Sequence, residues 1–177
     1  MGIKYNDKRD IEQNIIGNYF FFHIPRCGGT SVIGNSAHHS ARNWVPIIEY
    51  LYPNINFITQ VRNPFDRWES IFLYHKNRHG VKFKFNEWTQ RQITPRLHGN
   101  LQQSPMKPYM WITQYHFIPP NCEVHKLEDK TIWKVLGKTE VHRNKSKRLP
   151  IEWTEESRQL VRDYFKCDFK EFGYDIT

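Results

Sequence analysis

The segment FFFHIPRCGGTS, residues 20–31, decides the fold that this chain can adopt. It begins with a continuous aromatic and β-branched run, which is typical of a strand buried on both faces of a sheet. Pro25 ends the pairing of that strand, and Gly28 and Gly29 allow a tight turn before a helix. Backbone N–H groups at the beginning of a helix attract anions. The segment therefore predicts a loop that binds phosphate or sulfate, with a purely structural strand-to-helix turn as the alternative.

The rest of the chain alternates short β-rich runs with amphipathic helical patterns. Residues 56–62 and 122–128 predict two further strands, and Asn63-Pro64 is a typical beginning of a helix. This alternation indicates an α/β fold with a short parallel sheet flanked by helices. The expected helices cover residues 41–51, 64–77, 85–92 and 129–137, and a last helix begins at Thr154.

Length and composition limit the possible classes of protein. A chain of 177 residues suits one domain, and 26 Lys and Arg against 18 Asp and Glu give a net charge of +8, which favours an anionic partner. The 3 cysteines are far apart, so they suit neither a disulfide framework nor a metal site. Since no apolar stretch could span a bilayer and the first residues do not resemble a signal peptide, we expect a cytoplasmic protein without a membrane partner.

Three other kinds of glycine loop are excluded by spacing. A nucleoside triphosphatase loop requires a lysine directly after its last glycine, and no lysine follows Gly29. A dinucleotide fingerprint requires G-x-G-x-x-G, whereas these two glycines are adjacent. A cysteine phosphatase requires an arginine six positions after its nucleophile, and that position holds Ile33. Cys27 is therefore interpreted as a small loop residue.

A second group of polar residues follows the strand predicted over 56–62. The stretch VRNPFDRWES, residues 61–70, places Arg62 at the end of that strand and Ser70 in the early turns of the next helix. Ligands of open α/β sheets bind beyond the carboxyl ends of the strands. Arg62 and Ser70 are therefore expected to form a second anion site, with a surface ion pair between Arg62 and Asp66 as the alternative.

These residues resemble the motifs of the PAPS-dependent sulfotransferases, especially their carbohydrate branch, Golgi-type and bacterial. FFHIPRCGGTS is similar to that branch's 5′-phosphosulfate loop, F-x-H-x-P-K-T-G-G-T-[ST]. VRNPFDRWES resembles the 3′-phosphate motif R-x-P-x-x-R-x-x-S, and the tail from NKSKR to FGYD resembles the branch's ending. The resemblance covers residues 18–75 and 122–175.

The resemblance implies a single P-loop-like domain that transfers the sulfuryl group from 3′-phosphoadenosine 5′-phosphosulfate (PAPS) to an acceptor hydroxyl, with 3′-phosphoadenosine 5′-phosphate (PAP) as product. The acceptor would be a carbohydrate, and no metal is needed. Residues 18–75 would form the donor-binding core, 80–120 an acceptor-side insertion, and 122–175 a C-terminal strand, basic loop and helix. The implied donor-binding residues are Arg26, Cys27, Gly28, Gly29, Thr30, Ser31, Arg62, Ser70, Ser146 and Arg148.

Catalysis would require a cation at the leaving oxygen and a base for the acceptor hydroxyl. Arg26 stands where the family has a lysine, and it keeps the charge but is a poor proton donor, so donor binding should survive while turnover suffers. His38 matches the family's H-x-[ST]-A pattern and is the predicted base, with His39 as the alternative base and a substrate-binding residue. Tyr109 and Trp111 are predicted to bind the acceptor.

Two alternatives remain open. The positive charge and the 15% aromatic content also suit a domain that binds nucleic acid, although no nucleic-acid motif is present and we expect no such partner. Alternatively, the chain could be a sulfotransferase relic that binds the donor without turnover because of Arg26. The oligomeric state cannot be read from the sequence.

Overall fold

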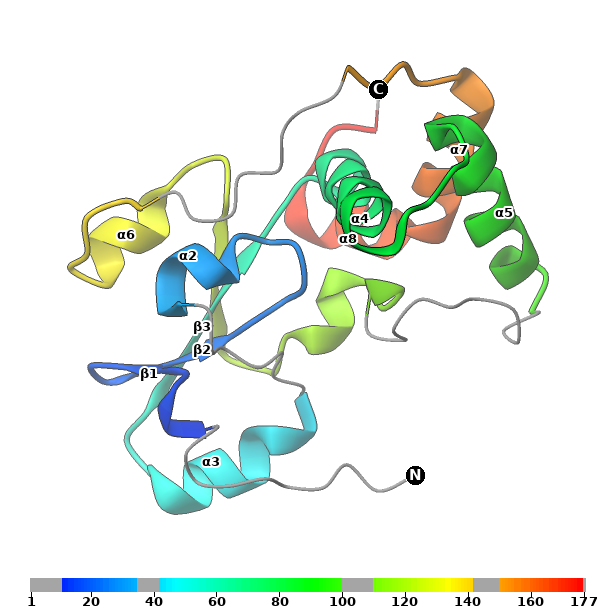
Figure 1. Ribbon diagram of the computed structural model, residues 1–177. Helices are drawn as coiled ribbons and strands as arrows, with labels where there is room; N and C mark the ends of the chain where they lie inside the picture. Colours follow the sequence, from blue (N-terminus) through cyan, green and yellow to red (C-terminus); the bar gives the residue numbers. More distant parts are fainter. Residues whose placement is uncertain (1–10, 35–41, 100–109, 142–149, 177) are drawn as a thin grey trace. The chain divides into compact units, whose positions relative to one another are not determined.

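The computed structural model describes residues 11–34, 42–99, 110–141 and 150–176 (Figure 1). We expected a single domain, and the structure groups the chain into two compact units. The sheet unit comprises Met1–Val61 and His116–Asn144, and the helical unit comprises Arg62–Tyr115 and Lys145–Thr177. Each unit is described by itself.

The sheet unit contains four strands in the order β1-β2-β3-β4. β2 pairs in parallel with β3, and β3 pairs in parallel with β4, as predicted for these three strands. The prediction of a purely parallel sheet is wrong, because β1 pairs antiparallel with β2. Gly17, with φ of 58°, and Asn18 form the short hairpin turn that makes this antiparallel pairing possible. The strands are β1 (Ile15–Ile16), β2 (Tyr19–Phe22), β3 (Asn56–Val61) and β4 (Cys122–Lys126).

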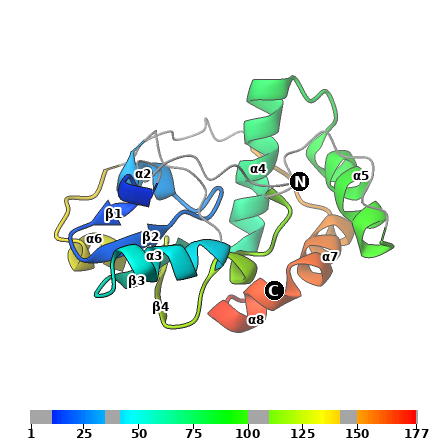
Figure 2. The same cartoon turned by 90° about the horizontal axis from the view of Figure 1, so that it is seen from below.

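Helices cover both faces of this sheet (Figures 1 and 2). On one face, Phe21 packs with side chains of α2 (Gly29–Ile33) and α6 (Thr131–Val135). On the other face, Phe20 and Phe22 pack with Ile48 of α3 (Val45–Leu51), which follows the 3-10 turn η1 (Arg42–Trp44). The continuous aromatic run is therefore explained, because both faces of β2 are buried. Strand and helix fold together as an α/β layer structure.

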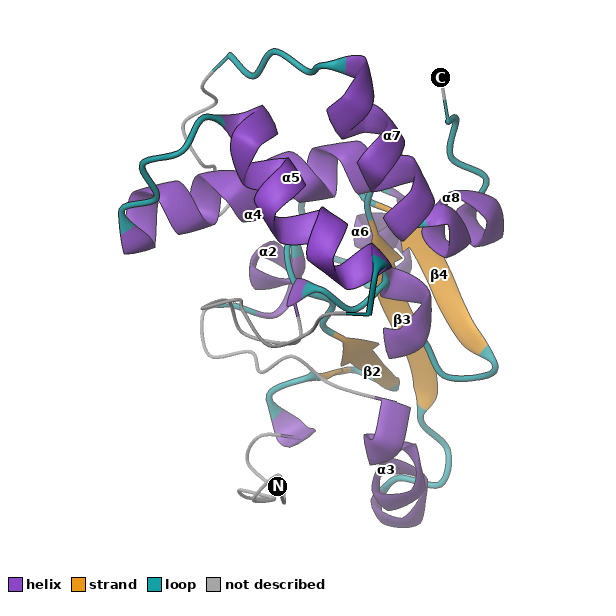
Figure 3. Cartoon of the chain, turned by 90° about the vertical axis from the view of Figure 1, so that its right-hand side faces the viewer, coloured by secondary structure: helices purple, strands orange, loops and turns teal. Residues whose placement is uncertain are grey.

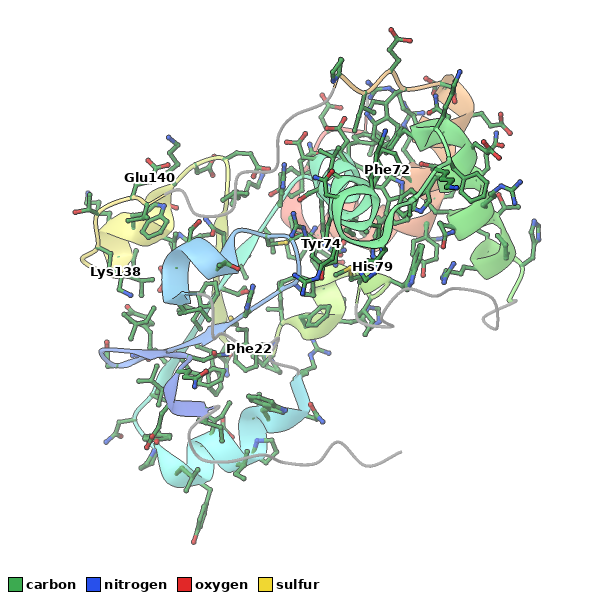
Figure 4. All side chains as sticks on the ribbon, in the orientation of Figure 1. Phe22, Phe72, Tyr74, His79, Lys138 and Glu140 are labelled. Carbon is green, nitrogen blue, oxygen red and sulfur yellow. The ribbon has the colours of Figure 1, made fainter. Side chains whose placement is uncertain are left out.

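Polar contacts fix the segment around α6 (Figure 4). Lys138 donates from Nζ to the carbonyl of Val32, a buried residue of α2, at 3.2 Å. Glu140 forms an ion pair with Lys130 at 3.1 Å. The first contact ties the segment after α6 to the end of α2, so both helices on this face are anchored to each other as well as to the sheet.

Figure 3 shows the helices of the helical unit in purple. This unit is built around a cluster of aromatic side chains. Trp68 is fully buried and its indole N–H donates to Thr89 at 3.0 Å, while its ring lies 4.7 Å from that of Trp88. Phe72, labelled in Figure 4, belongs to the same core. The α-helices described in this unit are α4 (Pro64–His79), α5 (Phe85–Leu97), α7 (Glu155–Tyr164) and α8 (Lys166–Phe172). A 3-10 turn, η3 (Gln114–Phe117), begins in this unit and ends in the sheet unit.

Two predicted helix beginnings are confirmed, and α4 and α5 both extend further than expected. The Asn63 side chain accepts from the N–H of Phe65 at the beginning of α4, and Thr154 accepts from Ser157 at the beginning of α7. α5 continues past Pro95 to Leu97, because packing of its buried face outweighs the helix-breaking effect of proline. In the described ranges, no helix combines the length and the apolar character that crossing a membrane requires.

Candidate functional site

The glycine loop of the sheet unit connects the end of β2 to α2. Arg26 has φ of 66° and Gly28 has φ of 79°, so the chain turns twice through the left-handed region. Cys27 is buried, its thiol donates to the carbonyl of Pro25 at 3.7 Å, and its N–H donates to Ile24 at 3.3 Å. Cys27 therefore shapes the loop through its own internal contacts, which agrees with its interpretation as a small loop residue.

The loop leaves backbone donors available. The N–H of Ser31 donates to the carbonyl of Gly28 at 2.9 Å, which closes the first turn of α2. By contrast, none of the hydrogen bonds found among the described residues uses the N–H of Gly28, Gly29 or Thr30. Three consecutive N–H groups of this kind, beside the partly exposed side chains of Arg26 and Thr30, are typical of an anion site.

Close contacts within the sheet unit disfavour a side chain at both loop glycines. A Cβ atom on Gly29 would lie 2.0 Å from Cδ2 of the buried His23 ring. A Cβ atom on Gly28 would lie 2.9 Å from Cδ1 of Leu127 and 3.2 Å from Oε1 of Gln60. The His23 ring therefore packs directly against the loop and leaves no room for a side chain at position 29.

Gln60 was not predicted as a site residue. It lies on β3, is only 1% exposed, and has no hydrogen-bond partner for either Oε1 or Nε2 among the described residues. The signal in the sequence was a single amide within the strand end FITQV, in which Thr59 is the one other polar residue. Its contact with the loop depends on the tertiary structure.

In the helical unit, the backbone of Arg62 is held on both sides by one side chain. Gln114 accepts from the N–H of Arg62 with Oε1 at 2.8 Å and donates from Nε2 to the carbonyl of Arg62 at 2.8 Å. The buried carboxylate of Asp168 in turn accepts from the N–H of Gln114 at 2.9 Å and from that of Tyr115 at 3.0 Å. This network fixes the backbone position from which the Arg62 side chain extends. Neither Gln114 nor Asp168 was predicted to take part in it.

Burial raises the pKa of the Asp168 carboxyl. The nearby guanidinium of Arg67 and the hydrogen bonds from Gln114 and Tyr115 oppose this effect on the pKa. Arg67 is itself buried and donates to the carbonyl of Ile112 at 3.1 Å. The carboxylate is therefore a structural acceptor whose charge is partly compensated by a buried arginine.

The guanidinium of Arg62 remains available for a ligand. Within the described ranges it makes no hydrogen bond or ion pair, so the alternative of a surface pair with Asp66 is not observed. Ser70, on α4, is only 7% exposed. Arg62 is thus the better supported member of the predicted second anion site.

Of the remaining predicted site residues, only Trp111 lies within the described ranges. Trp111 is buried in the core of the helical unit, with the guanidinium carbon of Arg96 3.4 Å from the centre of its ring, so the structure favours packing over acceptor binding. In the described part of the chain, no group of three His, Cys, Asp or Glu side chains could hold a metal ion. The residues that lie outside the described ranges are His38, His39, Tyr109, Ser146 and Arg148.

No family model, curated protein or solved structure matches the chain. The residues themselves and the geometry within each unit are therefore what indicate a function. In the sheet unit, that geometry suits the binding of an anionic group by backbone donors and a nearby cation. In the helical unit, it presents an arginine with a fixed backbone, which suits an oxyanion ligand.

Gly29→Ala tests the close contact between the loop and His23. Helix propensity alone predicts a gain of about 1 kcal/mol, whereas the contact with the imidazole predicts a loss of about 1–3 kcal/mol in the free energy of unfolding. We expect the loss, measured by urea denaturation. The double variant His23→Ala/Gly29→Ala should lose less free energy of unfolding than the sum of the two single losses, because the imidazole that meets the new Cβ atom is absent. An unchanged or raised stability of Gly29→Ala would contradict the packing described here.

Asp168→Asn tests the network around Arg62. At neutral pH we expect a loss of about 1–3 kcal/mol in the free energy of unfolding, because at least one buried N–H loses its acceptor. The folded-state pKa of Asp168 is raised above 3.8, so the folded wild-type binds the proton more tightly and gains stability as the pH falls through that pKa. Denaturation at several pH values should show this gain in the wild-type protein and not in the variant.

The matched control for Asp168 is Asp163→Asn. Asp163 lies on α7, where its carboxylate accepts from Gln159 at 2.8 Å on the exposed side of the helix. This change should alter the free energy of unfolding by less than about 0.5 kcal/mol. Equal effects of the two substitutions would show that Asp168 is not the central acceptor of the network.

Proposed function

We propose that the protein is a sulfotransferase that moves the sulfuryl group of PAPS to an acceptor hydroxyl, on a carbohydrate. The observation that carries the proposal is the place of the glycine loop. It follows the carboxyl end of β2, whose parallel neighbour β3 leads directly into the second motif at Arg62. Ligands of open α/β sheets bind beyond such strand ends, so the order of the two motifs along the chain suits a donor with two anionic groups.

The glycine loop supplies the chemistry that the phosphosulfate needs. The open N–H groups of residues 28–30 would bind its oxygens, and the hydroxyls of Thr30 and Ser31 would add donors. Arg26 would place a permanent positive charge near the oxygen that leaves with PAP. Its left-handed backbone costs about 1–2 kcal/mol for a residue with a side chain. The presence of a cation where the backbone conformation favours glycine supports a role for its charge.

The second anionic group of the donor, the 3′-phosphate, is assigned to Arg62 and Ser70. Gln114 holds both backbone polar groups of Arg62, so only the side-chain torsions of this arginine need to be ordered when a ligand binds. The guanidinium can donate two parallel hydrogen bonds to a phosphate. Its lack of a partner among the described residues supports this assignment.

The transfer would proceed in line. The acceptor oxygen forms a bond to sulfur while the bond between sulfur and the bridging oxygen breaks, and PAP leaves with the electron pair. His38 would accept the proton of the acceptor hydroxyl, with His39 as the alternative base. Ser146 and Arg148 would close over the donor, and Tyr109 would contact the acceptor. These five residues lie outside the described ranges, so their roles depend on the sequence motifs.

Calorimetric titration with PAP and with ADP tests the proposal. PAP carries the 3′-phosphate and ADP lacks it, so a working second anion site should bind PAP at least tenfold more tightly, which is about 1.4 kcal/mol. Arg62→Ala should remove this preference. Arg91→Ala is the matched control, because Arg91 lies on the exposed side of α5 in an ion pair with Glu87. Equal or absent binding of the two nucleotides by the wild-type protein would refute the proposed donor site.

Arg26→Lys separates an active enzyme from a relic that only binds the donor. Lysine keeps the positive charge and can also give a proton to the leaving oxygen, so we expect turnover to be retained or raised and PAP affinity to change less than about tenfold. Turnover would be measured as release of PAP from PAPS in the presence of a panel of oligosaccharides. If both proteins bind PAP and neither releases it from PAPS with any acceptor, the chain is a relic.

A further inference from the structure

Gln60 carries a polar group that the fold itself does not use. Both its Oε1 and its Nε2 are buried without a hydrogen-bond partner among the described residues, at 1% exposure of the residue. Its neighbour Thr59 shows the usual arrangement, since its hydroxyl donates to the carbonyl of Phe22 at 2.7 Å. Buried polar groups are nearly always paired, because an unpaired one is costly. An apolar side chain at position 60 would avoid that cost.

The position of Gln60 points to the glycine loop. Ile58, two residues earlier on β3, faces the α2 and α6 side of the sheet, and Gln60 shares this face because side chains alternate along a strand. Its Oε1 lies 3.2 Å from the place that a Cβ atom on Gly28 would occupy. The amide is therefore packed directly against the loop whose N–H groups are open.

We propose that Gln60 is a donor-binding residue, whose Nε2 donates a hydrogen bond to an oxygen of the donor's 5′-phosphate, the part of the phosphosulfate that PAP retains. This inference rests on the proposed function. Rotation of the terminal amide exchanges Oε1 and Nε2 with little change in shape, so the donor end can face the loop when an anion is present. The bound oxygen would then satisfy a group that otherwise stays unpaired.

A neutral amide suits this position better than a charged side chain. Beneath the loop, a buried lysine or arginine would have to keep its charge without water whenever the site holds no donor molecule, which is far more costly than burying an amide. The amide adds one directed hydrogen bond, and it does not titrate. Gln60 would thus add recognition of the oxyanion, while Arg26 provides the positive charge.

Gln60→Leu tests the proposal through two readouts that should move in opposite directions. Leucine removes two unpaired polar atoms from the interior, so the melting temperature should rise. It also removes the donor to the anion, so binding of PAP measured by calorimetry should weaken at least tenfold. Ile58→Val is the matched control on the same face of β3, and it should lower the melting temperature while leaving PAP binding unchanged.

The outcomes separate this inference from the proposed function. If the wild-type protein binds PAP and Gln60→Leu binds it equally well, Gln60 is not a donor-binding residue, while the proposed function stands. If the wild-type protein does not bind PAP, the proposed function itself is wrong. Should Gln60→Leu fail to fold, Gln60→Glu provides the test, because a similarly shaped carboxylate repels the anion, and PAP binding that stays within threefold of wild type would overturn the proposal.

Discussion

Burial of β2 on both faces is the constraint on which the sheet unit depends. Phe20 and Phe22 pack towards α3, and Phe21 packs towards α2 and α6, so the strand can be stable only inside a layered α/β unit. Such a strand pairs in parallel with β3, which brings the carboxyl ends of both strands to one edge of the sheet. Hydrophobic burial of β2 thus puts the glycine loop at this edge of the sheet. The ability of the loop to bind an anion depends on that position.

Two glutamines illustrate how polar groups are used in the two units. Gln114 and Gln60 are both almost completely buried. The amide of Gln114 makes hydrogen bonds to Arg62 and Asp168. It pairs with the backbone N–H and carbonyl of Arg62, as a neighbouring strand would do in a sheet. The amide of Gln60 makes none among the described residues. The same side chain therefore serves structure in one unit, and in the other it supports the proposal of a ligand contact.

The glycine loop combines tight packing with unused donors. His23 leaves no room for a side chain at position 29, and Leu127 and Gln60 restrict position 28. The loop is therefore held in shape before any ligand binds, and its N–H groups do not need to be ordered at that moment. Preorganised donors of this kind lose little entropy on binding and stabilise developing charge effectively.

The sequence by itself determined the local features of this protein. Short β-rich runs predicted the strands β2, β3 and β4, and capping residues predicted where α4 and α7 begin, because both depend on neighbouring residues along the chain. The motif residues that carry the proposed function, Arg26 to Ser31 and Arg62, were also visible in the sequence.

Only the tertiary structure decided the features that join distant parts of each unit. Trp111 was expected to contact an acceptor, yet it packs in a core formed with residues far away in the chain. The support of Arg62 by Gln114 and Asp168, and the contact of Gln60 with the loop, likewise join residues separated by dozens of positions. Whether a buried amide finds a partner depends on which backbone groups folding brings beside it, and no local pattern records that.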